Sequence, residues 1–323
     1  MPLLCCQRGS LRFVIDTAGL VRVLSAEEIS RSRGRSLLDE SLIPCDPALI
    51  AGGSALPEET SAPSAALLFH RGPHRILVSV DRVERFASRA EPLRLSLPET
   101  IVSLLSGLVV AVLVVESSAG KTLLPQFDLS ALWDDPVAKF AARRSTTPAI
   151  PSPLSSTAVL TRPWSGSSRV TSRGTPRAGL LRWDAHPDGT TELAVPTSHV
   201  LELLATSDRL ELAGLPAALP GVCLWNNRLL PLYDPARLVD AQTRTIPLPY
   251  TLIVRTERPD QPLALALPTL PQRLRETSSY RPCVLGDEPL DRLLWGRFSN
   301  SESMLLVPAW DRCLLHTLLA EAV

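Results

Sequence analysis

Short apolar runs separated by turn signals occupy most of the chain. A His-Pro-Asp-Gly turn separates two such runs, Leu180 to Trp183 and Thr191 to Val195. Another turn separates Thr251 to Arg255 from Leu263 to Leu267. Runs of this length with turn residues at both ends are typical of β-strands joined in hairpins. The pattern therefore predicts a mostly-β protein built of barrels or sandwiches.

The N-terminal third carries the same pattern. Leu11 to Ile15 and Leu20 to Leu24 are expected to form a hairpin around a Thr-Ala-Gly turn. Ala66 to Phe69 and Arg75 to Val80 are expected to form another. Both expectations rest on short apolar runs joined by glycine-containing turns.

Short helical segments are expected at three places among the strands. Ser25 and Glu28 have the spacing of a capping box, which marks a helix start. Ile101 to Val115 is the most apolar run, but its 15 residues fall short of the about 20 that a membrane-spanning helix needs. Its first part is expected to be a short amphipathic segment, and Leu108 to Val115 a buried strand. Asp311 to Leu319 is expected to close the chain as a helix.

One hairpin, in the stretch Leu219 to Val239, is specified in more detail. Val222 to Trp225 is an apolar run, and Arg228 to Tyr233 runs back after Asn226-Asn227. Asparagine tolerates positive φ, so this pair suits a two-residue hairpin turn. Pro231 lacks a ladder donor and predicts an edge position or a bulge.

A Pro-Asp pattern recurs at the ends of apolar runs. In each copy the run reaches a proline, turns at an aspartate and continues into a leucine-bearing turn, which the aspartate is well placed to cap. The four copies are Pro44 with Asp46, Pro125 with Asp128, Pro231 with Asp234, and Pro308 with Asp311. They suggest an internally repeated β architecture. The alternative is chance, because short matches among common residues arise easily.

Composition and motifs argue against several functional classes. Lys+Arg and Asp+Glu are both 33, so the chain lacks the basic excess expected of a nucleic-acid-binding protein. The six cysteines form no C-x-x-C pair, and no histidine stands at zinc-ligand spacing from any of them. Gly120-Lys121-Thr122 lacks the upstream glycine of a phosphate-binding loop. We expect no catalytic residues, no metal and no cofactor, and hence a protein that is not an enzyme.

The segment 139–177 differs from its surroundings. It is rich in Ser, Thr, Pro and Arg and shows no hydrophobic periodicity, which is typical of a disordered linker. With 323 residues the chain has room for two domains, one on each side of this linker. No secretion signal or membrane span is recognisable, and a cytoplasmic location is expected.

The motifs after residue 178 resemble a known family. ELAVPTSHVLELL (192–204) is followed by LPAALPGVCLWNNRLLPLYDPARLV (215–239), TLIVRTERPDQPLALALPTL (251–270) and SMLLVPAWDRCLL (303–315). In this order they resemble the CheW-like domain of bacterial chemotaxis coupling proteins, over residues 178–321. Val200-Leu201-Glu202 matches the family's V-x-E.

The first part of the chain resembles the same domain less completely, over residues 10–138. ALLFHRGPHRILVSVDRVERF (66–86) contains the family's V-D-x-V, and LLPQFDLSALW (123–133) resembles its closing element. Only 13 residues lie between Ile29 and Ile43, against 26 between Leu203 and Leu230. The family's Arg-Gly hairpin has no room here, which indicates a contracted domain.

The resemblance implies a fold and a role. The fold is two tandem CheW-like domains, each of two small five-stranded, SH3-like β-barrels. The role is a non-catalytic adaptor between chemoreceptor cytoplasmic tips and the regulatory domain of a histidine kinase, which can bring it to membrane-associated receptor arrays. The expected partner-binding residues are Val200, Glu202, Gly221, Asn226, Asn227 and Arg228.

Two departures from the family keep an alternative open. The family's turn arginine falls on Asn226 and its glycine on Asn227, and the second V-D-x-V aspartate falls near Pro268. Arg228 is a candidate replacement for the lost arginine. The alternative is a divergent CheW-like scaffold that serves another sensory, motility or polar-localisation complex without receptor coupling.

Overall fold

The computed structural model of the chain describes fifteen stretches. They are residues 3–29, 42–47, 63–71, 74–86, 92–105, 107–117, 120–130, 179–185, 190–205, 208–212, 215–239, 247–258, 260–274, 280–286 and 288–320. The chain forms two compact units. Unit 1 comprises Met1–Asp134, His199–Leu270 and Leu314–Val323, and unit 2 comprises Asp135–Ser198 and Pro271–Cys313.

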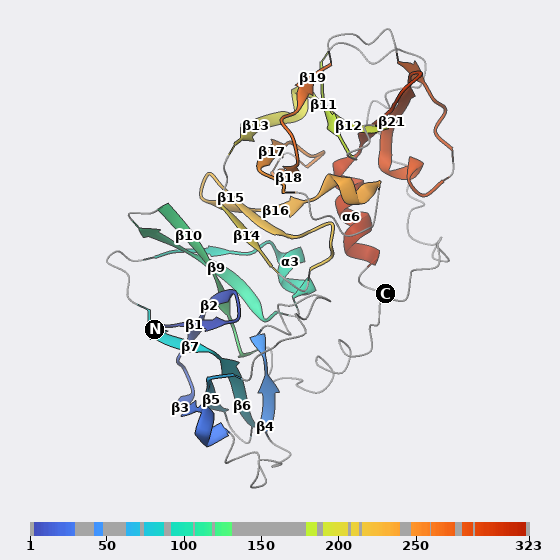
Figure 1. The fold of residues 1–323 in the computed structure, drawn as a ribbon. Coiled ribbons are helices and arrows are strands. Elements are labelled where there is room, and N and C mark those ends of the chain that lie inside the picture. The colour runs from blue at the N-terminus through green and yellow to red at the C-terminus, as the bar shows by residue number, and fades with distance from the viewer. Residues whose placement is uncertain are drawn as a thin grey trace. The chain divides into compact units, whose positions relative to one another are not determined.

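Sheet A of unit 1 has six strands (Figure 1). They are β1 (Leu3–Arg8), β2 (Leu11–Asp16), β7 (Arg82–Arg85), β8 (Leu93–Ser96), β9 (Val109–Ser117) and β10 (Gly120–Phe127). Their order is β7-β1-β2-β10-β9-β8, and only the β2–β10 pair is parallel. The short helix α3 (Glu99–Leu104) precedes β9, as the 101–115 run predicts.

Sheet B of unit 1 has four strands in the order β3-β5-β6-β4. They are β3 (Leu20–Ser25), β4 (Leu42–Cys45), β5 (Ala65–Arg71) and β6 (His74–Val80). β5 pairs antiparallel with both neighbours, and β4 pairs parallel with β6. The capping box after β3 is confirmed, because Ser25 N donates to Glu28 Oε2 at 2.8 Å and Glu28 N donates to Ser25 Oγ at 3.3 Å.

Sheet D of unit 1 comes from the second half of the chain. Its strands are β13 (Val200–Leu204), β14 (Arg209–Glu211), β15 (Gly221–Trp225), β16 (Arg228–Tyr233), β17 (Tyr250–Val254) and β18 (Leu263–Leu267). The order is β13-β17-β18-β16-β15-β14, with β16–β18 parallel. A core of six small and branched side chains lies within it: Cys223, Leu230, Leu232, Ile253, Ala264 and Ala266.

Sheet C forms unit 2. Its strands are β11 (Leu180–Asp184), β12 (Thr191–Pro196), β19 (Gln272–Arg273), β20 (Arg281–Pro282), β21 (Leu294–Ser299) and β22 (Met304–Pro308), in the order β19-β11-β12-β22-β21-β20. Trp183 stacks on Trp310, the first residue of α6 (Trp310–Ala320), with ring centroids 6.3 Å apart. Beside the core, Tyr280 donates its hydroxyl to Glu192 at 2.6 Å, and Arg182 donates to both groups.

The strand order is repeated along the chain. The strands of sheet C follow the same order as those of sheet A, with β11, β12, β19, β20, β21 and β22 in the places of β1, β2, β7, β8, β9 and β10. Each of these two sheets has a single parallel pair, at its centre. The four strands of sheet B, in the order β3-β5-β6-β4, correspond one by one to the strands β13-β17-β18-β16 of sheet D. Among the described residues sheet B has no counterpart of β14 and β15. The mostly-β prediction is confirmed, although the sheets hold six or four strands where the resemblance implied five.

The predicted hairpins have mixed outcomes. β5–β6, β11–β12, β15–β16 and β17–β18 are confirmed as antiparallel pairs. The hairpin expected from Leu11 to Leu24 is wrong, because β2 pairs with β1 and β10 whereas β3 pairs with β5 in another sheet. β2 has three consecutive buried residues, as a central strand requires, whereas β3 has three consecutive exposed ones. β1 itself was missed.

Pro231 is also placed differently from the prediction. Its strand β16 is internal, between β15 and β18, and not at an edge. The proline is tolerated because the β16–β18 ladder begins only at Leu232, opposite Ala264. On the other side Pro231 lies opposite Val222, in the pair that directly follows Cys223 and Leu230 when pairs are counted from the turn. The predicted linker 139–177 lies outside the described residues.

Candidate partner-binding surface

The turn between β15 and β16 forms as its two asparagines predict. Asn226 has φ 48° and Asn227 has φ 57°, and Trp225 and Arg228 close the hairpin as partners. Two consecutive residues in the left-handed region define a type I′ turn, whose twist matches that of the flanking strands. Asn226, Asn227 and Arg228 are all exposed, so the turn is accessible to a partner.

Gly221 has a structural role. It is buried at the start of β15, opposite Glu211 of β14. A Cβ at this position would overlap the carbonyl oxygen of Leu210, so only glycine permits β14 to approach this closely. Of the six predicted partner-binding residues, Gly221 is the one that the fold encloses.

Glu202 lies at the centre of exposed strand β13 and reaches the hairpin. The indole Nε1 of Trp225 donates a hydrogen bond to Glu202 Oε2 at 2.7 Å. Val200, at the start of the same strand, is half-buried. The structure thus brings Glu202 together with the Asn-Asn turn through Trp225, which precedes that turn. Sequence reasoning missed Trp225, although a tryptophan at the end of an otherwise buried strand was a usable signal.

Side-chain hydrogen bonds in sheet D join strands that are not neighbours in the strand order. β13 and β14 stand at opposite ends of the strand order. Arg209 of β14 donates to Thr251 Oγ1 of β17 at 2.8 Å and also to the carbonyl oxygens of Leu248 and Tyr250. Burial lowers the pKa of this guanidinium below its ordinary value. The Trp225–Glu202 bond is a second such link, from β15 to β13.

Two of the four predicted aspartate caps are confirmed. Asp234 Oδ1 accepts from Ala236 N at 3.0 Å and begins the 3-10 helix Pro235–Leu238, and Asp128 Oδ1 accepts from Ser130 N at 2.8 Å. Asp311 lies inside the first turn of α6 and not before it. For Asp46 the residues 48–50 that it would cap lie outside the described residues.

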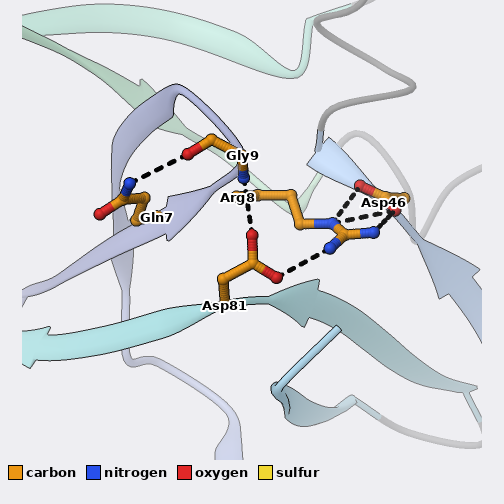
Figure 2. Close-up of polar contacts among 5 residues, drawn as sticks. All are labelled: Gln7, Arg8, Gly9, Asp46 and Asp81. Carbon is orange, nitrogen blue, oxygen red and sulfur yellow. Dashed lines mark hydrogen bonds and ion pairs between the residues drawn. The ribbon is translucent and has the colours of Figure 1, made fainter. Parts of the chain in front are cut away.

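Asp46 takes part in an ion-pair cluster around Arg8 (Figure 2). The guanidinium of Arg8 donates to both oxygens of Asp46 at 2.9–3.2 Å and to Asp81 Oδ1 at 2.8 Å. Asp81 Oδ2 also accepts from the backbone N of Gly9 at 2.7 Å. The bonds to Asp46 raise the pKa of Arg8 above its ordinary value. The cluster ties the end of β1 to residues that follow β4 and β6, and it also explains the V-D-x-V aspartate structurally.

The cysteines are poorly placed for nucleophilic chemistry. Five of the six are buried, and only Cys283 is partly accessible. Burial raises the pKa of Cys6 to about 12, and it also raises the pKa values of Cys45 and Cys313. A thiol reacts as its thiolate, so these three groups are inert near neutral pH.

The described stretches contain neither a clustered set of metal ligands nor a helix suited to a membrane. Within them, no three His, Cys, Asp or Glu side chains gather as a metal site would require. No helix found there is long and apolar enough to cross a bilayer. The candidate surface is the exposed Asn-Asn turn together with strand β13, and an exposed strand of this kind suits contact with another protein.

Comparisons with known proteins give little beyond this geometry. No family model matches the sequence, and no curated protein matches it. Among solved structures the chain is similar to the scaffolding protein TtCheW from Thermoanaerobacter tengcongensis, with a TM-score of 0.32 and 12% sequence identity. That similarity covers 41% of this chain and 88% of TtCheW.

Proposed function

We propose that the protein is a non-catalytic adaptor of bacterial chemotaxis-type signal transduction, which couples chemoreceptors to a histidine kinase. The proposed partners are the regulatory domain of the kinase and the cytoplasmic tip of a chemoreceptor. The proposal starts from the ordered motifs of residues 178–321, which resemble the CheW-like domain. The proposed location is cytoplasmic, with recruitment to receptor arrays.

The domain organisation proposed with it is two CheW-like domains, residues 10–138 and 178–321, joined by the linker 139–177. It is supported by the strand order that sheets A and B share with sheets C and D. β1 lies before residue 10 and pairs along its whole length with β2, so the first domain includes it. The contraction of this domain corresponds to the β14–β15 pair, which sheet D has and the described part of sheet B lacks.

The observation that carries the functional proposal is the position of Glu202. The glutamate of the V-x-E stretch is exposed on β13, and Trp225 links it to the hairpin turn where the family has its arginine. Two separate stretches that the resemblance marks as partner-facing therefore form one accessible surface. Exposed β-strand edges with a few apolar and charged side chains are a common mode of protein recognition.

The test is a pull-down of the full chain with a chemotaxis kinase regulatory domain and a receptor tip from the same organism. Glu202→Arg reverses the charge at the centre of the surface and is expected to abolish binding to at least one partner. Arg281→Glu is the matched control, because Arg281 is exposed on β20, at the end of another sheet. Binding of neither partner by a folded wild-type protein would refute the coupling role.

A second candidate function has one specific observation in its favour. Asn226 and Asn227 preserve the shape of the hairpin turn but remove the arginine of the family pattern. A scaffold that serves another sensory, motility or polar-localisation complex would keep the fold and lose that charge. If Asn226→Arg creates receptor or kinase binding that the wild type lacks, this second function is supported. The variant needs a check of folding, since arginine at positive φ costs about 1 kcal/mol.

A further inference from the structure

One strand in each half of the chain exposes an apolar–charged–apolar triplet. In β3 the triplet is Val21–Val23, with Val21 58% and Val23 49% exposed. In β13 it is Leu201–Leu203, with Leu201 37% and Leu203 41% exposed. Large aliphatic side chains exposed two residues apart on a strand are typical of interaction surfaces more than of ordinary solvent-facing strands.

The two triplets occupy the same place in the repeated strand order. β3 begins the order of sheet B and β13 begins that of sheet D, each beside the corresponding strand β5 or β17 (Figure 1). Each has a bulge at the first residue of its triplet, because Leu20 and Arg22 pair with consecutive residues of β5, as Val200 and Glu202 do with β17. Among the described residues no strand pairs with the outer edge of either.

The central residues of the triplets carry opposite charges, Arg22 in β3 and Glu202 in β13. We propose that the β3 edge of one molecule docks against the β13 edge of a second copy of this chain. In an antiparallel arrangement with Arg22 opposite Glu202, Val21 lies opposite Leu203 and Val23 opposite Leu201. One register therefore matches both the charges and the apolar side chains. Cross-strand pairs of these kinds are the ones that stabilise neighbouring strands.

The charges also determine which edges meet. A contact between two β3 edges in this register would place Arg22 opposite Arg22, and one between two β13 edges would place Glu202 opposite Glu202. Like charges directly opposite each other are destabilising. The contact is therefore heterologous, and each molecule bound through its β3 edge keeps a β13 edge for the next. Such contacts build rings or open chains of copies.

The intramolecular contacts of both residues are compatible with this docking. Arg22 lies 3.5 Å from Glu28, but both side chains are well exposed, and surface ion pairs of this kind contribute little. Glu202 receives the Trp225 hydrogen bond on Oε2, and a carboxylate accepts several hydrogen bonds at once. The indole also holds Glu202 in place, which reduces the entropy lost on binding.

The test is sedimentation velocity of the purified full chain over a wide range of concentration. The wild type is expected to form larger species as its concentration rises. Arg22→Glu and Glu202→Arg should each weaken this association about tenfold or more, since an attractive pair becomes a repulsive one. Arg281→Glu, on the edge strand β20, should leave it unchanged.

Two further arms make the outcome specific to this contact. The double variant Arg22→Glu/Glu202→Arg restores opposite charges and should recover association. A mixture of the two single variants should also associate, because β3 of each then faces an oppositely charged β13. A monomer at every concentration, or self-association insensitive to both single reversals, would overturn the proposal. The experiment contains neither kinase nor receptor, so its failure is distinct from failure of the proposed function.

Discussion

Replacing Arg8 by methionine is expected to destabilise unit 1 strongly. Arg8 is 5% exposed and donates to two carboxylates, Asp46 and Asp81, whose side chains are 17% and 26% exposed. Arg8→Met keeps much of the aliphatic volume but leaves both carboxylates without their cation. Removal of one member of a buried ion pair costs about 3–5 kcal/mol. Because water reaches both aspartates in part, we expect a loss of about 3 kcal/mol.

The assay for Arg8→Met is urea unfolding followed by far-ultraviolet circular dichroism, with hydrogen exchange to locate the loss. Exchange should accelerate in β1 and β4, which adjoin the cluster. Arg12→Met, at an exposed position of the neighbouring strand β2, is the matched control, and its effect should stay within about 0.5 kcal/mol.

A rescue variant separates the charge effect from lost packing. If uncompensated carboxylates cause the loss, adding Asp46→Asn and Asp81→Asn to Arg8→Met should recover about 1 kcal/mol or more. The asparagine at position 81 can still accept from Gly9 N through its amide oxygen. The reasoning is refuted if Arg8→Met is no more damaging than Arg12→Met, or if the neutral triple variant recovers nothing.

Two further predictions follow from close contacts in the two units. Gly221→Ala should destabilise the protein by about 3 kcal/mol, because the new Cβ overlaps the carbonyl oxygen of Leu210, and a thermal melt with normal stability would contradict this. Tyr280→Phe should cost about 1–2 kcal/mol, since Glu192 loses the hydroxyl hydrogen bond. Burial first, and then the bond to Glu192, raise the pKa of Tyr280, so the phenol's contribution is complete below about pH 10 and declines as the pH rises above it. Urea titrations at increasing pH should therefore show the difference between wild type and Tyr280→Phe shrinking in alkali, and a constant difference would disprove the pKa argument.

The local features of the fold follow from neighbouring residues. The Asn226-Asn227 turn, the Ser25–Glu28 capping box and the Asp128 and Asp234 caps each involve groups within a few positions of one another. Such features need only local backbone preferences and short-range hydrogen bonds, so their sequence patterns predict them.

Strand pairing followed the sequence only where the chain turns back on itself. β5–β6 and β17–β18 are confirmed hairpins, whereas β2 and β3 enter different sheets although a glycine turn joins them. An apolar run specifies a strand but not its partner, because the partner depends on contacts with residues far away in the chain. β1 could not be predicted for the same reason. Its Cys5-Cys6 pair is no strong strand signal, and the strand is held in sheet A by its pairing with β2 and β7.

The candidate surface was also only partly predictable. The resemblance led to Glu202 and the asparagine turn, and both are exposed. It led equally to Gly221, which the approach of β14 encloses. The exposed valines of β3 and leucines of β13 would ordinarily be assigned to a core, because a strand pattern does not reveal which edge remains uncovered.

By itself the sequence determined the mostly-β class, the positions of most strands and the conformation of the tight turns, because these depend on residues close in the chain. The tertiary structure alone decided which strands share a sheet, that Pro231 lies in an internal strand, and that Asp46 and Asp81 meet on Arg8. It also decided that two oppositely charged strands remain at open edges among the described residues. These four features, which are the grouping of strands, the position of Pro231, the Arg8 cluster and the two edge strands, have one physical reason. Long-range pairing and burial are set by the competition among all strands for partners, and no local pattern contains that competition.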